Sequence, residues 1–264
     1  MISRRQQSNL TAERILSIAP KVERTGAFRL EMVREQRTIN AFLAFSYGRC
    51  CFPTDNEAAE VLEAGELDYF RQVKSNKRRK QFFLGRSVGK KAISLYLNEN
   101  NLTGVEISAG VFRQPYVRYC LRDNPAVTLS HSADFAVAIA YDPGHIMGVD
   151  VEHVDSGRAH MFKENLTEHE KEIAVRTGCE QNLVSNVMWT MKEALSKAIK
   201  CGMTVPLDIL EVEQLHLHSD GSFISRFKHF GQYKACSWLL RGFALSIVLP
   251  RRTELRLDVS KFGL

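Results

Sequence analysis

The chain has 264 residues, 44% of them hydrophobic, so it is long enough to bury one large core or two smaller ones. Its formal net charge of +6 favours an acidic partner: nucleic acid, a phosphate-rich cofactor, an anionic membrane or an acidic protein. No apolar run reaches the length of a membrane span, and the first residues lack the apolar region of a secretory signal. We therefore expect a cytoplasmic protein that does not act at a membrane.

The cysteine pattern favours a reducing compartment. None of the six cysteines forms a C-x-x-C pair, and the adjacent Cys50 and Cys51 are poorly spaced for a disulfide or a zinc site. We interpret all of them as reduced, small hydrophobic side chains of a cytosolic protein.

The first part of the chain is the least informative, and we assign no function to residues 1–60. A short helix is expected at 11–18, and residues 42–52 fit a strand or a buried segment. Residues 53–56 predict a turn before a helix that starts near Glu57.

Residues 65–98 predict a helical and basic region. The basic run at 74–80 leads into apolar positions at helical spacing. Such a run is typically a solvated face, and the alternative is a surface that binds nucleic acid. Phe82 and Phe83 fall where the core face of the helix needs them, which argues against aromatic platforms that stack on bases.

The middle of the chain predicts a series of strands. These are expected at 105–107, 113–117, 126–132, 135–141 and 148–152. One of them contains Ser130-His131-Ser132, which no G-x-S-x-G surrounds, so a hydrolase nucleophile is not indicated. Its histidine and hydroxyls either donate to a phosphate or are bonded locally at the end of the strand.

The C-terminal part predicts helices followed by strands. Thr167 and Glu170 form a capping box inside a charged helical segment at 158–177, and a long helix is expected at 186–201. Strands follow at 207–217, 222–227, 233–240 and 243–249, with Asp220-Gly221 as a hairpin turn. The tail after residue 250 is unassigned.

A weak internal sequence repeat predicts the arrangement of these elements. Residues 83–93 resemble residues 189–199, and strands follow each of them. We expect an α+β fold of two similar lobes, each a long helix packed on a small antiparallel sheet, with the active site in the cleft between them. The N-terminal lobe is placed at residues 1–145, and the C-terminal lobe at residues 146–264 carries the metal-binding motifs.

Two stretches carry the chemistry. In Gly148–Glu152 the alternation with valine predicts a strand, so Asp150 and Glu152 leave the same face. Neighbouring carboxylates repel unless a cation lies between them, and hard oxygen ligands suit Mg²⁺. On a predicted helix, Glu193 and Lys197 are four residues apart and share a face. If the strand face and the helix face meet, three carboxylates and one ammonium come together, and such a group fits the binding of a Mg²⁺-bound phosphate. Taken singly, each stretch is more typical of a solvated face.

These stretches resemble the signature of the 4'-phosphopantetheinyl transferases, in particular the monomeric type that activates surfactin and enterobactin synthetases. The family pattern G-[IV]-D-[IV]-E is GVDVE at Gly148–Glu152, and W-[ST]-x-K-E-[AS]-x-x-K is WTMKEALSK at Trp189–Lys197. Ser130-His131 is similar to the family's S-H motif, and Phe83-Leu84-Gly85-Arg86 to its basic helix. Arg113-Gln114-Pro115 stands where many members have G-K-P.

The resemblance, which covers roughly residues 65–250, implies a reaction. The 4'-phosphopantetheine arm of coenzyme A moves to a serine of an apo acyl- or peptidyl-carrier protein, and adenosine 3',5'-bisphosphate leaves. By this resemblance Asp150, Glu152 and Glu193 would hold Mg²⁺. Glu193, directly or through a metal-bound water, would also accept the serine proton, and Lys197 would offset charge on the pyrophosphate or protonate the leaving group. Charge neutralisation is the main catalytic need, because the hydroxyl attacks a charged pyrophosphate.

The resemblance also implies how coenzyme A and the carrier bind. Ser130 and His131 would hold the 3'-phosphate, and Arg86 with Arg79 would add to the adenine-nucleotide pocket. Carrier proteins are generally acidic, so a basic, monomeric enzyme of secondary metabolism fits its partner by electrostatic steering.

Three alternatives stay open. Met188, Met191 and Leu195 either line a carrier groove or, as their helical spacing favours, pack in the core. The protein can instead be a nucleic-acid-binding protein that uses the 74–80 run, although no nucleic-acid-binding motif supports this. It can also be an inactive family member that only binds carriers, against which the intact acids and Lys197 argue.

Overall fold

A computed structural model describes residues 24–48, 52–119, 124–154 and 159–263. The helix expected at 11–18, together with Cys50, Cys51 and Cys120, lies outside this part of the chain. Cys179, Cys201 and Cys236 are free thiols, as the reduced interpretation requires. Among the helices described here, none is long and apolar enough to cross a membrane.

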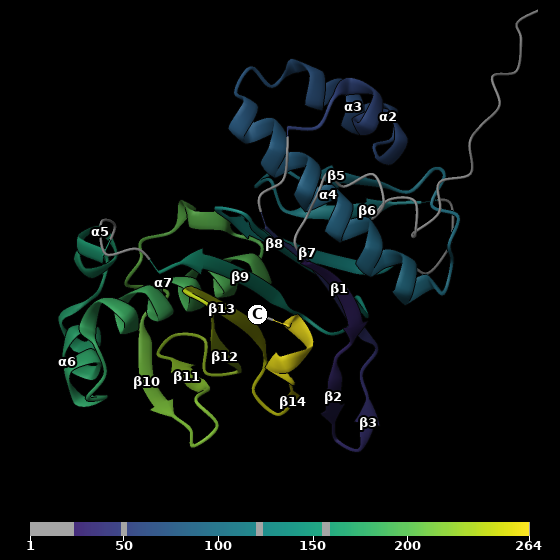
Figure 1. Cartoon of the computed structure of the whole chain (residues 1–264). Helices are drawn as coiled ribbons and strands as arrows, with labels where there is room; N and C mark the ends of the chain where they lie inside the picture. Colours follow the sequence, from purple (N-terminus) through teal and green to yellow (C-terminus); the bar gives the residue numbers. More distant parts are fainter. Residues whose placement is uncertain (1–23, 49–51, 120–123, 155–158, 264) are drawn as a thin grey trace, which may run out of the picture.

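The first sheet is four-stranded and antiparallel, and one long helix covers it (Figure 1). In spatial order its strands are β1 (Arg24–Arg29), β4 (Ala41–Tyr47), β8 (Phe135–Tyr141) and β7 (Ala126–Ser132), and the helix is α4 (Asn76–Leu97). Every residue of β8 is buried, because alternate side chains meet different layers. Alanines such as Ala138 pack under α4, whereas Phe135 and Val137 face the second sheet.

The second sheet is five-stranded and antiparallel, and it carries the other long helix. In spatial order its strands are β10 (Val212–Leu217), β11 (Phe223–Phe227), β12 (Tyr233–Leu240), β13 (Phe243–Pro250) and β9 (Gly148–His153), and the helix is α7 (Gln181–Ala198). Val149 and Val151 of β9 pack against Val137 of β8 in a core between the two sheets. The layers therefore run helix, sheet, sheet, helix.

Short elements flank each long helix. Before and after α4 come α2 (Asp55–Val61), α3 (Ala64–Gln72) and the hairpin of β5 (Glu106–Ala109) and β6 (Pro115–Arg118). Around α7 lie α5 (Ala159–Glu164), α6 (Glu168–Arg176) and the 3₁₀ helix η1 (Gly202–Thr204). Capping boxes begin α2 at Thr54 and α6 at Thr167, which confirms a helix near Glu57 and the predicted box at Thr167. The turn predicted at 53–56 is wrong in its second half, because residues 55 and 56 already belong to α2.

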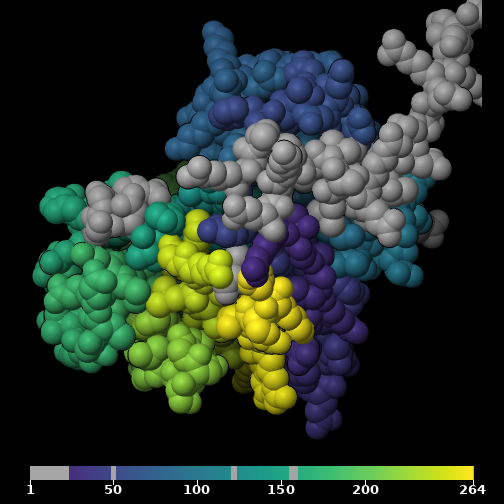
Figure 2. All heavy atoms as spheres, viewed as in Figure 1, coloured from purple at the N-terminus to yellow at the C-terminus, as the bar shows by residue number. Residues whose placement is uncertain are grey.

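The end of the chain returns to the N-terminal strands. A small antiparallel sheet is formed by β14 (Glu254–Arg256), β2 (Glu31–Arg34) and β3 (Arg37–Thr38), and the 3₁₀ helix η2 (Val259–Phe262) follows. The buried Phe262 ring lies edge-on to Phe28, with centroids 5.7 Å apart. Figure 2 shows the yellow C-terminal residues beside the purple N-terminal ones. Neither β1–β3 nor this tail was predicted.

The mixed class of helices and antiparallel sheets is confirmed, while the duplication of one lobe and the boundary between 1–145 and 146–264 stay predictions. The strands expected at 126–132 and 135–141 agree residue for residue with β7 and β8. The helix expected from residue 186 begins earlier, at Gln181, shortly after Gly178 turns the chain with a φ of 69°.

Candidate active site

Asp150 lies in a buried polar cluster between β7, β9 and α7. The residue is 1% exposed, so the alternative of a solvated strand face is wrong for it. Its Oδ1 accepts hydrogen bonds from Lys197 Nζ and Ser130 Oγ, each at 2.6 Å. Its Oδ2 is buried without a hydrogen-bond partner among the described residues. A buried carboxylate oxygen without a donor calls for a ligand, a proton or a cation.

Hydroxyl side chains of β7 join the two sheets at this point. Thr128 Oγ1 accepts from the backbone N–H of Val149 at 3.2 Å, and Ser132 Oγ donates to Glu152 Oε2 at 2.7 Å. With Ser130 between them, three hydroxyls alternate along one face of the strand. Sequence reasoning missed Thr128, for which the period-two spacing was the available signal, whereas the hydroxyl of Ser132 has one of the two roles left open for it, a local hydrogen bond.

Glu193 of α7 meets the same cluster. Burial raises the pKa of its carboxyl to about 8, the charges of Asp150 and Glu152 add to the rise, and Lys197 opposes it. When Glu193 and Asp150 are both ionised, neither can donate a hydrogen bond, so Asp150 Oδ2 has no donor. A proton on Glu193 or a cation between the carboxylates would satisfy that atom. The predicted carboxylates and ammonium thus lie close enough to influence one another.

The chemistry of these donors fits a hard divalent cation, since they are carboxylate oxygens and one of them has no partner. Yet in the part of the chain that the structure describes, no three His, Cys, Asp or Glu side chains are gathered into a metal-ligand cluster. In this structure the ammonium of Lys197 is the cation that lies beside Asp150. Binding of Mg²⁺ by these carboxylates stays a prediction.

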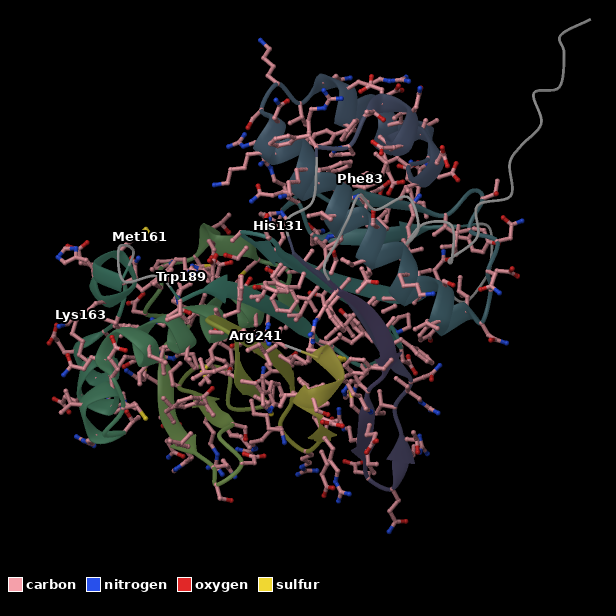
Figure 3. The ribbon with its side chains drawn as sticks, viewed as in Figure 1. Phe83, His131, Met161, Lys163, Trp189 and Arg241 are labelled. Atoms are coloured by element: carbon pink, nitrogen blue, oxygen red, sulfur yellow. The ribbon has the colours of Figure 1, made fainter. Side chains whose placement is uncertain are left out.

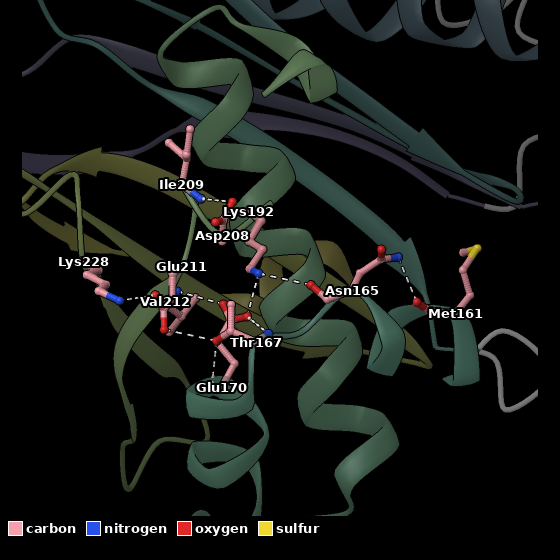
Figure 4. A network of polar contacts seen from close by, with 10 residues as sticks. All are labelled: Met161, Asn165, Thr167, Glu170, Lys192, Asp208, Ile209, Glu211, Val212 and Lys228. Atoms are coloured by element: carbon pink, nitrogen blue, oxygen red, sulfur yellow. Dashed lines mark hydrogen bonds and ion pairs between the residues drawn. The ribbon is translucent and has the colours of Figure 1, made fainter. Parts of the chain in front are cut away.

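The first lysine of the WTMKEALSK motif has a different environment, to which sequence reasoning gave no role. Lys192 is fully buried, and its Nζ donates to Glu170 Oε2 at 2.6 Å and to the Asn165 carbonyl at 3.3 Å (Figure 4). The other oxygen of Glu170 accepts from the backbone N–H of Val212 at 2.9 Å. This buried pair fastens α7 to α6 and to the start of β10, and so holds the helix that presents Glu193.

The apolar face of α7 belongs to the core. Met188, Met191 and Leu195 are fully buried between the helix and the second sheet. Their interpretation as core residues is confirmed, and they are not accessible to a carrier protein.

Ser130 and His131 leave opposite faces of β7. Ser130 is bonded to Asp150, whereas His131 lies on the face toward α4, where a Cβ atom on Gly85 would be 3.9 Å from its ring (Figure 3). Burial lowers the pKa of His131, and the charge of Lys197 lowers it further. Its Nδ1 is buried without a hydrogen-bond partner in the described structure. The prediction that both residues hold one phosphate stays untested.

The two arginines predicted for the nucleotide pocket differ in surroundings. Arg86 Nε lies 3.4 Å from Glu66, and its guanidinium is 4.5 Å from the centre of the Phe82 ring. Arg86 also lines a cavity of about 500 Å³. Arg79 instead forms an ion pair with Asp55 of α2. The structure therefore brings Arg86 to a cavity and engages Arg79 in helix packing.

The rest of the basic run is largely solvated. Lys80 is paired with Asp134 at 2.6 Å, while Lys74, Lys77 and Arg78 are exposed. Exposed cations in one run are the ordinary pattern of a solvated face, and the nucleic-acid alternative stays a prediction.

Two cavities share Arg113 in their walls. The smaller, of about 210 Å³, is lined by Glu193 and Lys197 together with residues of the β5–β6 hairpin, β7 and η1. The larger is lined by Arg86 and by the aromatic rings of Tyr69 and Tyr116, among others. The two cavities are therefore neighbours at Arg113.

Comparison with known proteins assigns a class to part of the chain. Residues 146–248 match the family model of the 4'-phosphopantetheinyl transferase superfamily, which confirms the coarser family prediction for that segment. The segment contains Asp150, Glu193 and Lys197. No curated protein matches the chain significantly. The surfactin and enterobactin subtype, and the resemblance before residue 146, stay predictions.

Proposed function

We propose that the protein transfers the 4'-phosphopantetheine arm of coenzyme A to a serine of an apo carrier protein, with Mg²⁺, and releases adenosine 3',5'-bisphosphate. One observation carries the proposal. The buried Asp150 and the half-buried Glu193 and Lys197 form a charged cluster beside a cavity, within the segment that matches the transferase superfamily. Such a cluster suits phosphoryl transfer, where placing charge around the phosphate is the main requirement.

In the proposed step the serine oxygen attacks the phosphorus next to the pantetheine arm, and the bond from that phosphorus to the leaving adenosine bisphosphate breaks. Glu193 accepts the serine proton, directly or through a water, in its ionised form, which a pKa of about 8 makes the minor form at neutral pH. Lys197 offers its ammonium to the charge on the leaving phosphate. Mg²⁺ held by Asp150, Glu152 and Glu193 would neutralise further charge on the pyrophosphate.

Binding of coenzyme A is proposed to use both cavities. The guanidinium of Arg86 and the rings of Tyr69 and Tyr116 suit a purine nucleotide, since aromatic faces stack on the base and arginine pairs with phosphate. His131, whose buried Nδ1 lacks a partner among the described residues, is proposed to contact the 3'-phosphate. Ser130 contributes to the same phosphate contact if its hydroxyl donates to that phosphate in place of Asp150.

The test mixes the protein with coenzyme A, Mg²⁺ and an apo carrier protein, and measures the carrier by mass spectrometry. We expect a mass gain of one phosphopantetheine, which chelation of Mg²⁺ abolishes. Asp150→Ala and Glu193→Ala should each lower the rate by about 10²-fold or more, because a charged group at the reacting phosphate is lost. Glu172→Ala, which removes an exposed acid of α6, is the matched control. No gain on several carriers would overturn the proposal.

A further inference from the structure

The hydroxyl of Ser132 lies between two consecutive residues of β9. The serine is buried, and its Oγ accepts from the backbone N–H of His153 at 3.1 Å. Its own proton is donated to Glu152 Oε2 at 2.7 Å. A hydroxyl that accepts from an amide is polarised, which strengthens the hydrogen bond that it donates. One side chain therefore holds both the carboxylate of Glu152 and the backbone that follows it.

The serine has a rigid support of its own. It is the last residue of β7 and pairs with Phe135 of β8 across a tight turn. In that turn Ala133 has a left-handed φ of 49°, which short hairpin turns require. Asp134 accepts from Lys80 Nζ at 2.6 Å, so the turn is also tied to α4. The hydroxyl of Ser132 is thus presented at a fixed place, as the support of a functional carboxylate must be.

The end of β9 is held from the other side by α7. The buried amide of Asn186 donates from Nδ2 to the His153 carbonyl at 3.2 Å. Asn186 stands about two helical turns before Glu193 on the same helix. The strand end that carries Glu152 is therefore bound both to the sheet that contains Ser132 and to the helix that contains Glu193.

Glu152 needs this support more than Asp150 does. Asp150 is buried and is held by Ser130 and Lys197. Glu152 is only half-buried, and its side chain has one more rotatable bond. Fixing a glutamate side chain costs conformational entropy, and a hydrogen bond that orients it beforehand reduces the entropy lost when a cation binds. The charge of Glu152 acts on Glu193, which places its carboxylate within electrostatic range of the cluster.

We infer that Ser132 is a positioning residue, whose hydroxyl sets the orientation in which Glu152 meets the divalent cation. This inference rests on the proposed function, in which Asp150, Glu152 and Glu193 hold Mg²⁺. Side chains that hydrogen-bond a metal-ligating carboxylate change metal affinity by about 10- to 100-fold when they are removed. The loss of this hydroxyl should therefore weaken the binding of Mg²⁺, and not only the packing of β7 against β9.

The test titrates Mg²⁺ in the presence of saturating coenzyme A and follows the melting temperature. Ser132→Ala should raise the Mg²⁺ concentration that gives half of the full stabilisation by about tenfold or more. Ser132→Thr, which keeps the hydroxyl, should restore the wild-type value. The transfer rate of Ser132→Ala should fall most at limiting Mg²⁺ and much less at saturating Mg²⁺, because an excess of the cation compensates for the lower affinity.

Thr128→Val is the matched control, since it removes a hydroxyl from the same face of β7. Thr128 Oγ1 accepts from the Val149 backbone, and that bond joins the two sheets without holding a carboxylate. The variant should melt at a lower temperature with an unchanged Mg²⁺ dependence. An unchanged Mg²⁺ dependence in Ser132→Ala, or an equal shift in Thr128→Val, would overturn the positioning role alone. A wild type that neither transfers the arm nor is stabilised by Mg²⁺ would overturn the proposed function, and this role with it.

Discussion

Gly148 of β9 lies directly against the backbone of α7, so that a Cβ atom there would overlap the carbonyl oxygen of Ala194. The same atom would lie 2.7 Å from the backbone nitrogen of Ala198. Only glycine allows the helix to approach the strand this closely. The contact sets the distance between the two elements that carry Asp150 and Glu193, so the first residue of GVDVE is a packing residue of the candidate site.

Gly148→Ala should therefore destabilise the protein by about 2 kcal/mol or more, since the extra methyl group forces α7 away from β9. Urea unfolding measures the loss. Gly231→Ala is the control, because a Cβ atom at Gly231 meets nothing within 4 Å. Equal stability of the two variants would contradict the close approach.

Substitutions of the two lysines of WTMKEALSK should have different effects, one mainly on stability and the other mainly on the transfer rate. Lys192→Met leaves Glu170 buried and unpaired, which costs about 3–5 kcal/mol of unfolding free energy. A second substitution, Glu170→Met, should recover part of that loss, because it removes the unpaired charge. Lys197→Met should cost less stability, since a proton or Mg²⁺ can replace the ammonium beside Asp150. It should nevertheless lose most of the transfer rate. The comparison needs thermal melts and rates for each variant, and an unchanged rate in Lys197→Met would remove this lysine from the mechanism.

Stability should depend on pH through Glu193. The folded pKa of about 8 lies above the ordinary value of 4.5, so the folded protein binds the proton more tightly than the unfolded chain does. This contribution to stability is complete below pH 4.5 and is lost as the pH rises toward 8. Mg²⁺ should therefore raise the melting temperature more at pH 8.5 than at pH 6, because it competes with this proton.

Glu193→Gln is the control for this pH dependence. His131 has a lowered pKa and favours the folded state as pH rises through its range, which opposes the effect of Glu193. The difference between wild type and Glu193→Gln isolates the carboxyl, and it should vanish at low pH. A difference that stays constant from pH 5 to pH 8.5 would show that the pKa of Glu193 is not raised.

Recognition of the 3'-phosphate can be tested on His131. His131→Phe should raise the KM for coenzyme A by about tenfold, the value expected for one lost contact to a charged group. Dephospho-coenzyme A, which lacks the 3'-phosphate, should bind wild type and variant equally. If the variant weakens both ligands to the same degree, His131 acts elsewhere, for instance in the packing of β7 on α4.

Much of the local structure followed from the sequence. The alternation of valine with acids predicted β9, and a short, continuous apolar run predicted the fully buried β8. The capping box at Thr167 was equally readable, because a cap depends on residues three apart. The strands β1 to β3 were not predicted, although β2 and β3 pair with each other locally; β1 pairs with β4, and β2 also pairs with β14 near the end of the chain.

The sequence by itself determined which residues carry charge and which face of an element each one leaves, because these properties depend on the period of a single helix or strand. It also determined the match of residues 146–248 to a known superfamily. Only the tertiary structure decided what each charge meets. Lys197 pairs with Asp150, 47 residues away, and Lys192 with Glu170, although the two lysines stand in one motif. Their partners lie on other elements, so they depend on how the layers pack.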